Sequence, residues 1–183
     1  MTIDAYTFPI NNPSTFICGE HKISGQQWAK ECLALAQEIS SYSERNWLLY
    51  QDDFYQFSVC FFALLLANKN IVLAQSHQFE RLKQAATFAD ISIGNLNDES
   101  DLKLQLLPHF FSNQDSILNS EAASSVFDNL TLNAHAGITL FTSGSTGEAK
   151  AIKKYWYQLA NEIDSLQGLF PHENSCVLST VTH

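Results

Sequence analysis

Apolar residues in the first hundred positions recur at intervals of three and four in some segments and form short continuous runs in others. The intervals predict amphipathic helices, and the short runs predict strands. The predicted helices carry the stripe Trp28, Cys32, Leu35, Ala36 and Ile39, the apolar run within 54–67, and the stripe Phe79, Leu82, Ala85 and Phe88. The predicted strands span 46–50, 71–74 and 91–93. Strands that alternate with helices are typical of parallel βαβ units, so the predicted fold class is α/β with a mostly parallel sheet.

Polar residues at the ends of these segments support the predicted boundaries. Ser24 is predicted to cap the first helix, and Asp52 or Asp53 the second, because short oxygen-bearing side chains accept hydrogen bonds from the free N–H groups of a first helical turn. Asn68 and Asn70 follow the second helix and mark its end.

The flanking segments carry weaker patterns. Residues 7–23 predict a short strand or hairpin, and 95–137 predict loops with one or two strands or short helical turns. The elements predicted after residue 137 are a buried strand at 138–141, a short strand from Ile152, a helix with the stripe Trp156, Leu159, Ile163 and Leu166 that ends near Gly168, and a strand at 176–181.

The segment after strand 138–141 concentrates groups that bind anions. Its hydroxyls belong to Thr142, Ser143, Ser145 and Thr146, and its glycines are Gly144 and Gly147. Hydroxyls donate hydrogen bonds, glycines let a ligand approach the main chain, and successive N–H groups in such a turn form an anion-binding concavity. Most clusters of this composition are solvated loops. The strand before this one and the lysine after it favour a phosphate-binding loop here.

Charge is distributed unevenly along the chain. With 10 Lys and Arg residues against 19 Asp and Glu residues, the formal net charge is −9, which repels ATP at long range. Three of the ten basic residues, Lys150, Lys153 and Lys154, fall within five positions beside the loop and supply a local positive field. Lys150 is near enough to fold back over the loop and is the functional candidate. The other two are interpreted as a solvated face.

Several classes of protein are excluded by spacing and composition. The glycines fit neither the GxxxxGK[ST] loop of P-loop NTPases nor the dinucleotide-binding GxGxxG pattern. The six histidines lack metal-ligand spacing, and an acidic chain without a basic stripe argues against nucleic acid. The apolar run 57–67 is shorter than the about 20 residues of a membrane span. Four cysteines without a CxxC pattern, and no basic N-terminal signal region, predict a cytoplasmic protein with reduced thiols.

The stretch FTSGSTGEAK resembles the phosphate-binding signature of adenylate-forming enzymes, which include acyl- and aryl-CoA synthetases, peptide-synthetase adenylation domains and luciferases. Thr142 through Gly147, and Lys150, match that signature position for position. Ala149 stands where the family usually has proline, and Ala151 where it usually has glycine. Both differences concern the stiffness of the loop rather than the groups that contact phosphate.

The resemblance implies a reaction and a role for each matched residue. The loop 142–150 would close over the β- and γ-phosphates of ATP, and its binding residues would be Thr142, Ser143, Gly144, Ser145, Thr146, Gly147 and Lys150. A small carboxylic acid would attack the α-phosphorus to give an acyl-adenylate and pyrophosphate, and the acyl group would then pass to the thiol of CoA or of a carrier protein. Lys150, the catalytic candidate, would neutralise charge on the departing pyrophosphate. Mg²⁺ is implied as well, with its ligands outside these residues.

The position of the loop in the chain implies that other parts of such an enzyme are missing. In the family, the adenine pocket, the magnesium-binding acid, the ribose-binding aspartate and the C-terminal catalytic lysine all come well after the loop. We therefore expect residues 1–183 to be a partial N-terminal domain of a longer acid-adenylating ligase, inactive by itself. A non-catalytic nucleotide-binding module and a truncated remnant with exposed apolar surface are the alternatives.

Overall fold

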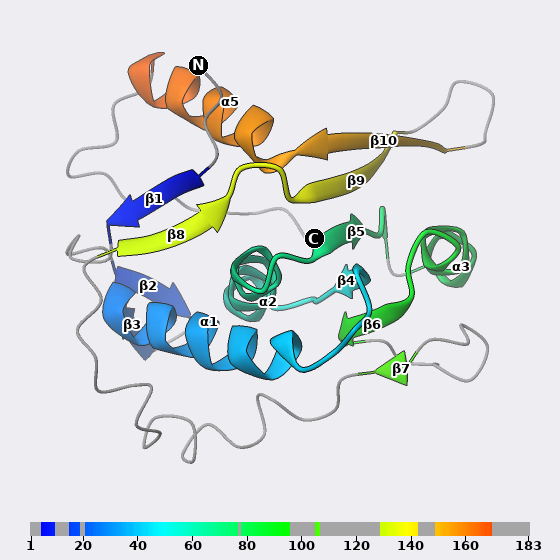
Figure 1. Cartoon of the computed structure of the whole chain (residues 1–183), viewed down its shortest axis with the longest axis horizontal. Helices are drawn as coiled ribbons and strands as arrows, with labels where there is room; N and C mark the ends of the chain where they lie inside the picture. Colours follow the sequence, from blue (N-terminus) through cyan, green and yellow to red (C-terminus); the bar gives the residue numbers. More distant parts are fainter. Residues whose placement is uncertain are drawn as a thin grey trace.

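The largest unit of the fold is a six-stranded sheet flanked by helices (Figure 1). The computed structural model describes residues 5–9, 15–18, 21–76, 78–95, 105–106, 129–142 and 149–169, and side chains within 23–76, 78–95, 131–142 and 149–169. The strands across the sheet are, in order, β10 (Lys150–Tyr155), β9 (Gly137–Thr142), β5 (Asn70–Leu73), β4 (Asn46–Tyr50), β6 (Ile91–Gly94) and β7 (Gln105–Leu106). Every neighbouring pair is parallel except β9 and β10, which are antiparallel. The predicted α/β class with a mostly parallel sheet is confirmed.

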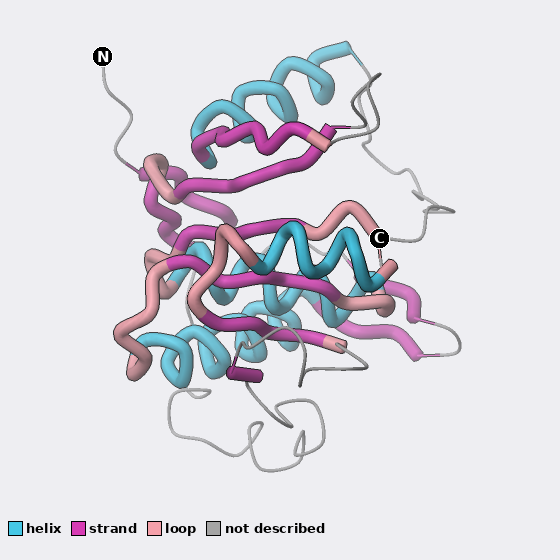
Figure 2. Tube along the Cα trace, turned by 90° about the vertical axis from the view of Figure 1, so that its right-hand side faces the viewer, coloured by secondary structure: helices cyan, strands magenta, loops and turns pink. Residues whose placement is uncertain are grey.

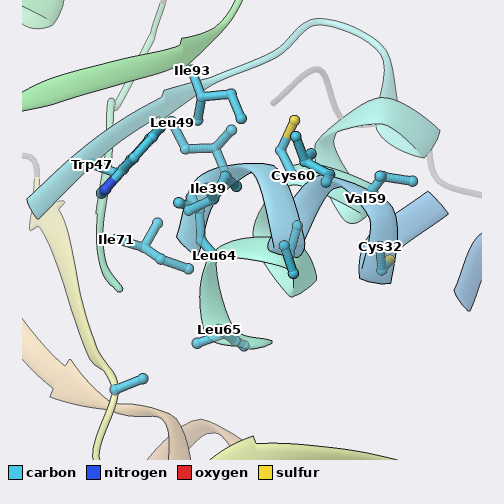
Figure 3. Packing of buried hydrophobic residues seen from close by; sticks show 14 of the residues in the cluster. Cys32, Ile39, Trp47, Leu49, Val59, Cys60, Leu64, Leu65, Ile71 and Ile93 are labelled. Carbon is cyan, nitrogen blue, oxygen red and sulfur yellow. The ribbon is translucent and has the colours of Figure 1, made fainter. Parts of the chain in front are cut away.

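One face of the sheet packs against two helices. These are α1 (Gly25–Ser40) and α2 (Phe54–Leu66), whose buried side chains form one hydrophobic cluster with those of the central strands. Figure 3 shows Trp47, Leu49 and Ile71 of the strands beside Ile39 and Leu64 of the helices. Because this face is covered, its strand positions are apolar throughout.

The opposite face packs against α3 (Phe79–Ala86), which lies on the near side of the strands in Figure 2. Leu48 and Tyr50 alternate with the residues that face the α1–α2 pair, and they contact Leu82 and Ala85 of α3. Phe88 was predicted to belong to the apolar stripe of this helix. It lies beyond the end of α3 and is 47 % exposed, which corrects that prediction.

Side-chain caps fix where α1 and α2 begin. The Oγ atom of Ser24 accepts a hydrogen bond from the Gln27 N–H at 3.2 Å. Similarly, Oδ1 of Asp53 accepts from the Gln56 N–H at 2.8 Å. Each bond satisfies an N–H group that has no partner within its own helix. Both predicted caps are confirmed, and of the two aspartates proposed for the second helix the cap is Asp53.

Two small antiparallel sheets accompany the main one. They pair β1 (Ala5–Pro9) with β8 (Asn129–Asn133), and β2 (Thr15–Cys18) with β3 (His21–Ser24). The second pair confirms the hairpin predicted within 7–23, and β7 and β8 are strands within the weakly patterned segment 95–137. Within the described residues, the helices are too short or too polar to cross a membrane.

Two elements after residue 136 are more exposed than the sequence predicted. In β9 only Gly137 and Ile138 are buried, because the covering helices lie mainly over β4, β5 and β6. The final helix, α5 (Trp156–Leu169), buries only Trp156 and Ala160. Two residues of its predicted stripe, Ile163 and Leu166, are 40 % and 54 % exposed, and Leu169 at the end of the helix is 73 % exposed. The strand before it begins at Lys150, two residues earlier than predicted.

A chain of polar side chains ties the amino ends of four adjacent strands together. The Asn70 side chain accepts from the Gly137 N–H of β9 at 3.0 Å and donates to Oδ1 of Asn46 in β4, also at 3.0 Å. Asn46 in turn donates to Oδ2 of Asp90, directly before β6, through both its main-chain N–H (3.0 Å) and its side chain (3.1 Å). These residues thereby bridge β9, β5, β4 and β6 in the order in which the strands lie.

Candidate functional site

The predicted phosphate loop begins and ends at neighbouring positions of the sheet. Thr142, the last residue of β9, is the register partner of Lys150, the first residue of β10. The Thr142 hydroxyl also donates to the Lys150 main-chain oxygen at 3.5 Å. The two ends of the loop are therefore held together at the base of an antiparallel pair (Figure 1). The five other predicted binding residues lie outside the described residues, and their roles stay predictions: Ser143, Gly144, Ser145, Thr146 and Gly147.

The base of this loop lies at the carboxyl edge of the parallel strands. Strands β9, β5 and β4 are parallel neighbours, so Thr142, Leu73 and Tyr50 end at the same edge of the sheet. The chain leaving β4 continues into α2 on one face, whereas the chain leaving β5 continues into α3 on the opposite face. Open α/β sheets bind ligands in the crevice where such connections diverge.

A cavity of about 310 Å³ occupies this part of the carboxyl edge. The chain at the ends of β4, β5 and β9 forms it, together with Phe57 from the first turn of α2. Its apolar walls include Leu49, Phe57, Leu73, Ala74, Leu140 and Phe141. Tyr50, Gln51 and Gln75 complete the lining. Phe141 immediately precedes Thr142, so the cavity and the predicted phosphate loop adjoin.

The far end of the loop is anchored to α3. The side chain of Gln84 donates from Nε2 to the main-chain oxygen of Ala149 at 3.0 Å, and Ala149 is buried. Arg81 donates to Oε1 of the same glutamine at 3.4 Å. This contact restrains Ala149, the position at which the chain differs from the proline of the signature that it resembles. Sequence reasoning missed Gln84, because nothing in helical periodicity signals a contact across 65 residues.

The three clustered lysines differ in their surroundings. The ammonium of Lys154 forms an ion pair with Glu162 at 2.6 Å. That of Lys153 lies 5.7 Å from the centre of the Tyr155 ring. Both lysines contact residues on the α5 side of β10, away from the loop. These contacts agree with the interpretation that Lys153 and Lys154 belong to a solvated face and do not contact phosphate. Lys150 is exposed at the end of the loop, and its role toward phosphate stays a prediction.

Acidic side chains at the carboxyl edge are engaged structurally. The Tyr50 hydroxyl donates to Oδ1 of Asp52 at 2.7 Å, and Asn95 donates to Oδ2 of the same carboxylate at 3.4 Å. Burial of Tyr50, followed by its hydrogen bond to the negatively charged Asp52, raises the pKa of this tyrosine to about 12. The described side chains include no group of three His, Cys, Asp or Glu residues placed to hold a metal ion.

Known proteins resemble this chain in structure rather than in sequence. No protein-family model and no curated protein matches it. It is similar to a double mutant of o-succinylbenzoate CoA synthetase (MenE) from Bacillus subtilis bound with the product analogue OSB-NCoA, with a TM-score of 0.66 and 13 % identity over 91 % of this chain and 37 % of that one. For MenE in complex with the acyl-adenylate intermediate OSB-AMP, the TM-score is 0.60 and the identity 12 %, over 84 % and 41 %.

A second enzyme gives the same result. The N-terminal subdomain of NpsA from Klebsiella oxytoca, in complex with 3-hydroxyanthranilyl-AMSN, matches with a TM-score of 0.55 and 20 % identity over 79 % of this chain and 36 % of that one. The chain thus spans less than half the length of the structures that it matches. At these identities the likeness establishes architecture, and it confirms the sequence resemblance at that level. The chain has the fold of the N-terminal subdomain of adenylate-forming enzymes.

Proposed function

We propose that the chain is the N-terminal part of an ATP-dependent ligase that converts a small carboxylic acid into an acyl-adenylate and then transfers the acyl group to a thiol of CoA or a carrier protein. The observation that carries this proposal is the placement of the signature segment. Its two ends, Thr142 and Lys150, are register partners at the carboxyl edge of the sheet, beside a cavity. The complexes of MenE with OSB-AMP and OSB-NCoA support the same chemistry.

The loop residues have defined roles in this proposal. Thr142 to Gly147 donate hydrogen bonds to the β- and γ-phosphates of ATP, each worth roughly 1.5–3 kcal/mol because the acceptor is charged. The carboxylate oxygen of the substrate attacks the α-phosphorus, the bond to the bridging oxygen breaks, and pyrophosphate leaves with the extra negative charge. Lys150 stabilises that charge. Transfer at phosphorus depends on positioning and electrostatics rather than on a protein nucleophile, so such a loop suffices for this part of the site.

Other parts of the reaction belong to regions beyond this chain. Mg²⁺, when bound with ATP, neutralises phosphate charge, and we propose that its protein ligands lie outside residues 1–183. The acceptor thiol and most contacts to adenine are likewise assigned to the remainder of a longer, cytoplasmic enzyme. This assignment agrees with the 36–41 % of the neighbouring structures that the chain spans.

The test is carboxylate-dependent exchange of pyrophosphate into ATP by the natural protein at its full length. Lys150→Ala and Thr146→Ala should each lower exchange by roughly 10²–10³-fold, the usual effect of removing one group that stabilises developing charge. Lys153→Ala is the matched control, since it removes a lysine from the same exposed strand whose ammonium lies over Tyr155. Exchange that survives both loop substitutions, or that falls equally in the control, would contradict the proposed role of the loop.

A non-catalytic nucleotide-binding module is the second candidate. Within the described residues, the buried side chains of α1, α2 and the central strands form one continuous hydrophobic cluster. Such a core favours a module that holds its fold by itself. Calorimetric titration of the 183-residue chain with MgATP distinguishes the candidates. Binding without exchange in the full-length protein would favour the module, whereas exchange in the full-length protein favours the ligase.

A further inference from the structure

We infer that Gln84 is a positioning residue for the predicted phosphate loop. Its side chain fixes Ala149, and thereby the position of Lys150 relative to a bound anion. That this anion is a phosphate of ATP rests on the proposed function. The restraint itself rests on contacts among described residues of α3, β9 and β10.

Gln84 satisfies a main-chain oxygen at the exit from the loop. Its Nε2 atom donates to the Ala149 oxygen at 3.0 Å, a usual distance for an N–H···O hydrogen bond. Because Ala149 is buried, its main-chain oxygen needs such a partner. Arg81 donates from Nη1 to Oε1 of the same carboxamide at 3.4 Å, which leaves the NH₂ group to face Ala149. The two contacts together orient the carboxamide.

The helix that carries Gln84 is itself held against the sheet. Leu82 and Ala85, which flank Gln84 along α3, are buried in one cluster with Leu48 and Val72 of the central strands. A side chain that projects from a packed helix holds its target more precisely than one that projects from a loop. The hydrogen bond to Ala149 therefore ties the loop exit to a fixed part of the fold.

The chain that follows α3 contacts the entry to the loop. The ring of Phe88, two residues beyond α3, lies 5.5 Å from the ring of Phe141 at an interplanar angle of 73°, an edge-to-face arrangement. Phe141 directly precedes Thr142, the register partner of Lys150. Gln84 and Phe88 thus contact the chain on both sides of the loop, so its two ends are placed relative to the same helix.

A restraint matters at this position because alanine leaves its own backbone free to rotate. A proline, as in the signature that the chain resembles, would fix φ covalently at about −65°. Among the described residues, Asn68 is the one non-glycine residue with positive φ, so Ala149 has the sign of φ that proline requires. The hydrogen bond from Gln84 restricts from outside a backbone that proline would restrict from within, and Lys150 is the next residue along the chain.

The expected effect on ligand binding follows from the strength of one hydrogen bond. Its loss corresponds to roughly a two- to ten-fold change in an equilibrium constant. When only a fraction of the protein holds the binding arrangement, the apparent affinity falls by that fraction. Without the restraint on Ala149, the affinity for MgATP should therefore fall by roughly two- to ten-fold.

The test begins with Gln84→Met in the natural protein at its full length, because methionine keeps the length of the side chain and removes the NH₂ donor. Hydrogen exchange measured by mass spectrometry should become roughly two- to ten-fold faster in residues 150–155 and stay unchanged in the central strand 46–50. Gln37→Met makes the same change on the exposed side of α1 and should alter neither segment. Unchanged exchange at 150–155 in Gln84→Met would overturn the inference.

A second substitution separates the positioning of Lys150 from the mere attachment of α3. Ala149→Pro restricts the same backbone covalently. In Gln84→Met/Ala149→Pro, both the exchange at 150–155 and the affinity for MgATP, measured by calorimetry, should return to within about two-fold of the unmodified protein. A role limited to attaching α3 predicts no recovery, because proline does not restore the contact between helix and strand. Failure of the double variant to recover would therefore overturn the positioning role.

Two comparisons keep this test decisive. Ala149→Pro alone should bind MgATP at least as tightly as the unmodified protein, which shows that the proline is accommodated. If it binds less tightly, Gln84→Lys replaces the rescue, because a lysine ammonium can donate to the same oxygen. That variant should keep the slow exchange at 150–155, and exchange as fast as in Gln84→Met would contradict the inference.

The MgATP titrations separate this inference from the proposed function. Faster exchange in Gln84→Met with unchanged MgATP affinity would overturn the positioning role and leave the proposed ligase standing. Absence of MgATP binding by the unmodified protein would contradict the proposed function and remove phosphate as the anion. The restraint on Ala149 would then still be decided by the exchange at 150–155.

Discussion

Replacing Asn70 by alanine tests the polar bridge across the amino ends of the strands. This side chain accepts from the Gly137 N–H at 3.0 Å and donates to Asn46 at 3.0 Å. Gly137 is buried, so its N–H group would lose its partner in a place where water does not readily replace it. The substitution therefore removes two hydrogen bonds and leaves one buried donor unsatisfied.

The expected loss follows from these contacts. An unsatisfied buried N–H group costs about 1–3 kcal/mol, and a net hydrogen bond between neutral side chains contributes about 0.5–1.5 kcal/mol. The free energy of unfolding should fall by roughly 2–4 kcal/mol, which for a chain of this size lowers the melting temperature by roughly 5–15 °C. Such a loss is a large part of the stability of a typical domain.

Urea unfolding monitored by tryptophan fluorescence measures the loss, because Trp28, Trp47 and Trp156 are all buried. Asn95→Ala is the matched control. Its side chain is exposed and makes one 3.4 Å hydrogen bond to Asp52, so it should cost less than about 0.5 kcal/mol. Amide hydrogen exchange adds a local readout, since the Gly137 N–H should exchange faster in Asn70→Ala. Equal stability of the two variants, with unchanged exchange at Gly137, would refute the reasoning.

Three further predictions concern other parts of the fold. Gly94→Ala should lower the free energy of unfolding by roughly 2–6 kcal/mol, from backbone strain and overpacking, because φ is +119° and a Cβ atom would lie 1.8 Å from the Tyr50 oxygen. Gly168→Ala is the control, because its Cβ atom would lie in open space on α5, and it should be neutral or stabilising by up to about 1 kcal/mol. Urea unfolding measures both variants, and a similar loss of the free energy of unfolding in the two would contradict this reasoning.

The pKa of Tyr50 is about 12 in the folded state, against about 10 for an unperturbed tyrosine. Between these two pH values the folded state keeps the hydroxyl proton while the unfolded chain loses it. The free energy of unfolding should therefore not change with this group below about pH 10. Between pH 10 and 12 it should fall by at most about 2.7 kcal/mol, and by less where water reaches the hydroxyl. Tyr50→Phe should flatten that decline in unfolding titrations. Burial raises the pKa of Cys60 to about 12, so iodoacetamide at pH 8 should label this thiol only after the chain unfolds. Peptide mass spectrometry measures the labelling. Rapid labelling of the folded chain would exclude the buried position.

The main helices and strands follow from local rules, which explains why the sequence was sufficient to predict them. Residues 46–50 were predicted as a strand with the bounds of β4, since a short apolar run covered on both faces differs clearly from its polar neighbours. Ser24 and Asp53 act as caps because a cap needs only the N–H groups three residues ahead. The signature from Thr142 to Lys150 was recognisable for the same reason, since its residues are contiguous.

Exposure was harder to predict, because it depends on which elements lie over each strand or helix. Ile163 and Leu166 have the spacing of a buried stripe, but within the described residues α5 meets the core only near Trp156 and Ala160. Strand β9 was predicted to be buried, yet beyond Ile138 it is only partly covered. Helical or strand periodicity identifies the face that can be buried and carries no information on whether a partner reaches it.

The sequence by itself determined the α/β class, the caps and the position of a segment that resembles a phosphate-binding signature, because each depends on residues close together in the chain. The tertiary structure decided what surrounds that segment. It paired Thr142 with Lys150, brought Gln84 to the oxygen of Ala149, and assembled a cavity from the ends of β4, β5 and β9. These contacts join residues as many as about ninety positions apart, and they arise from the order of strands in the sheet and from the opposite faces taken by α2 and α3. Strand order follows from the packing of the whole core, and no local pattern encodes it.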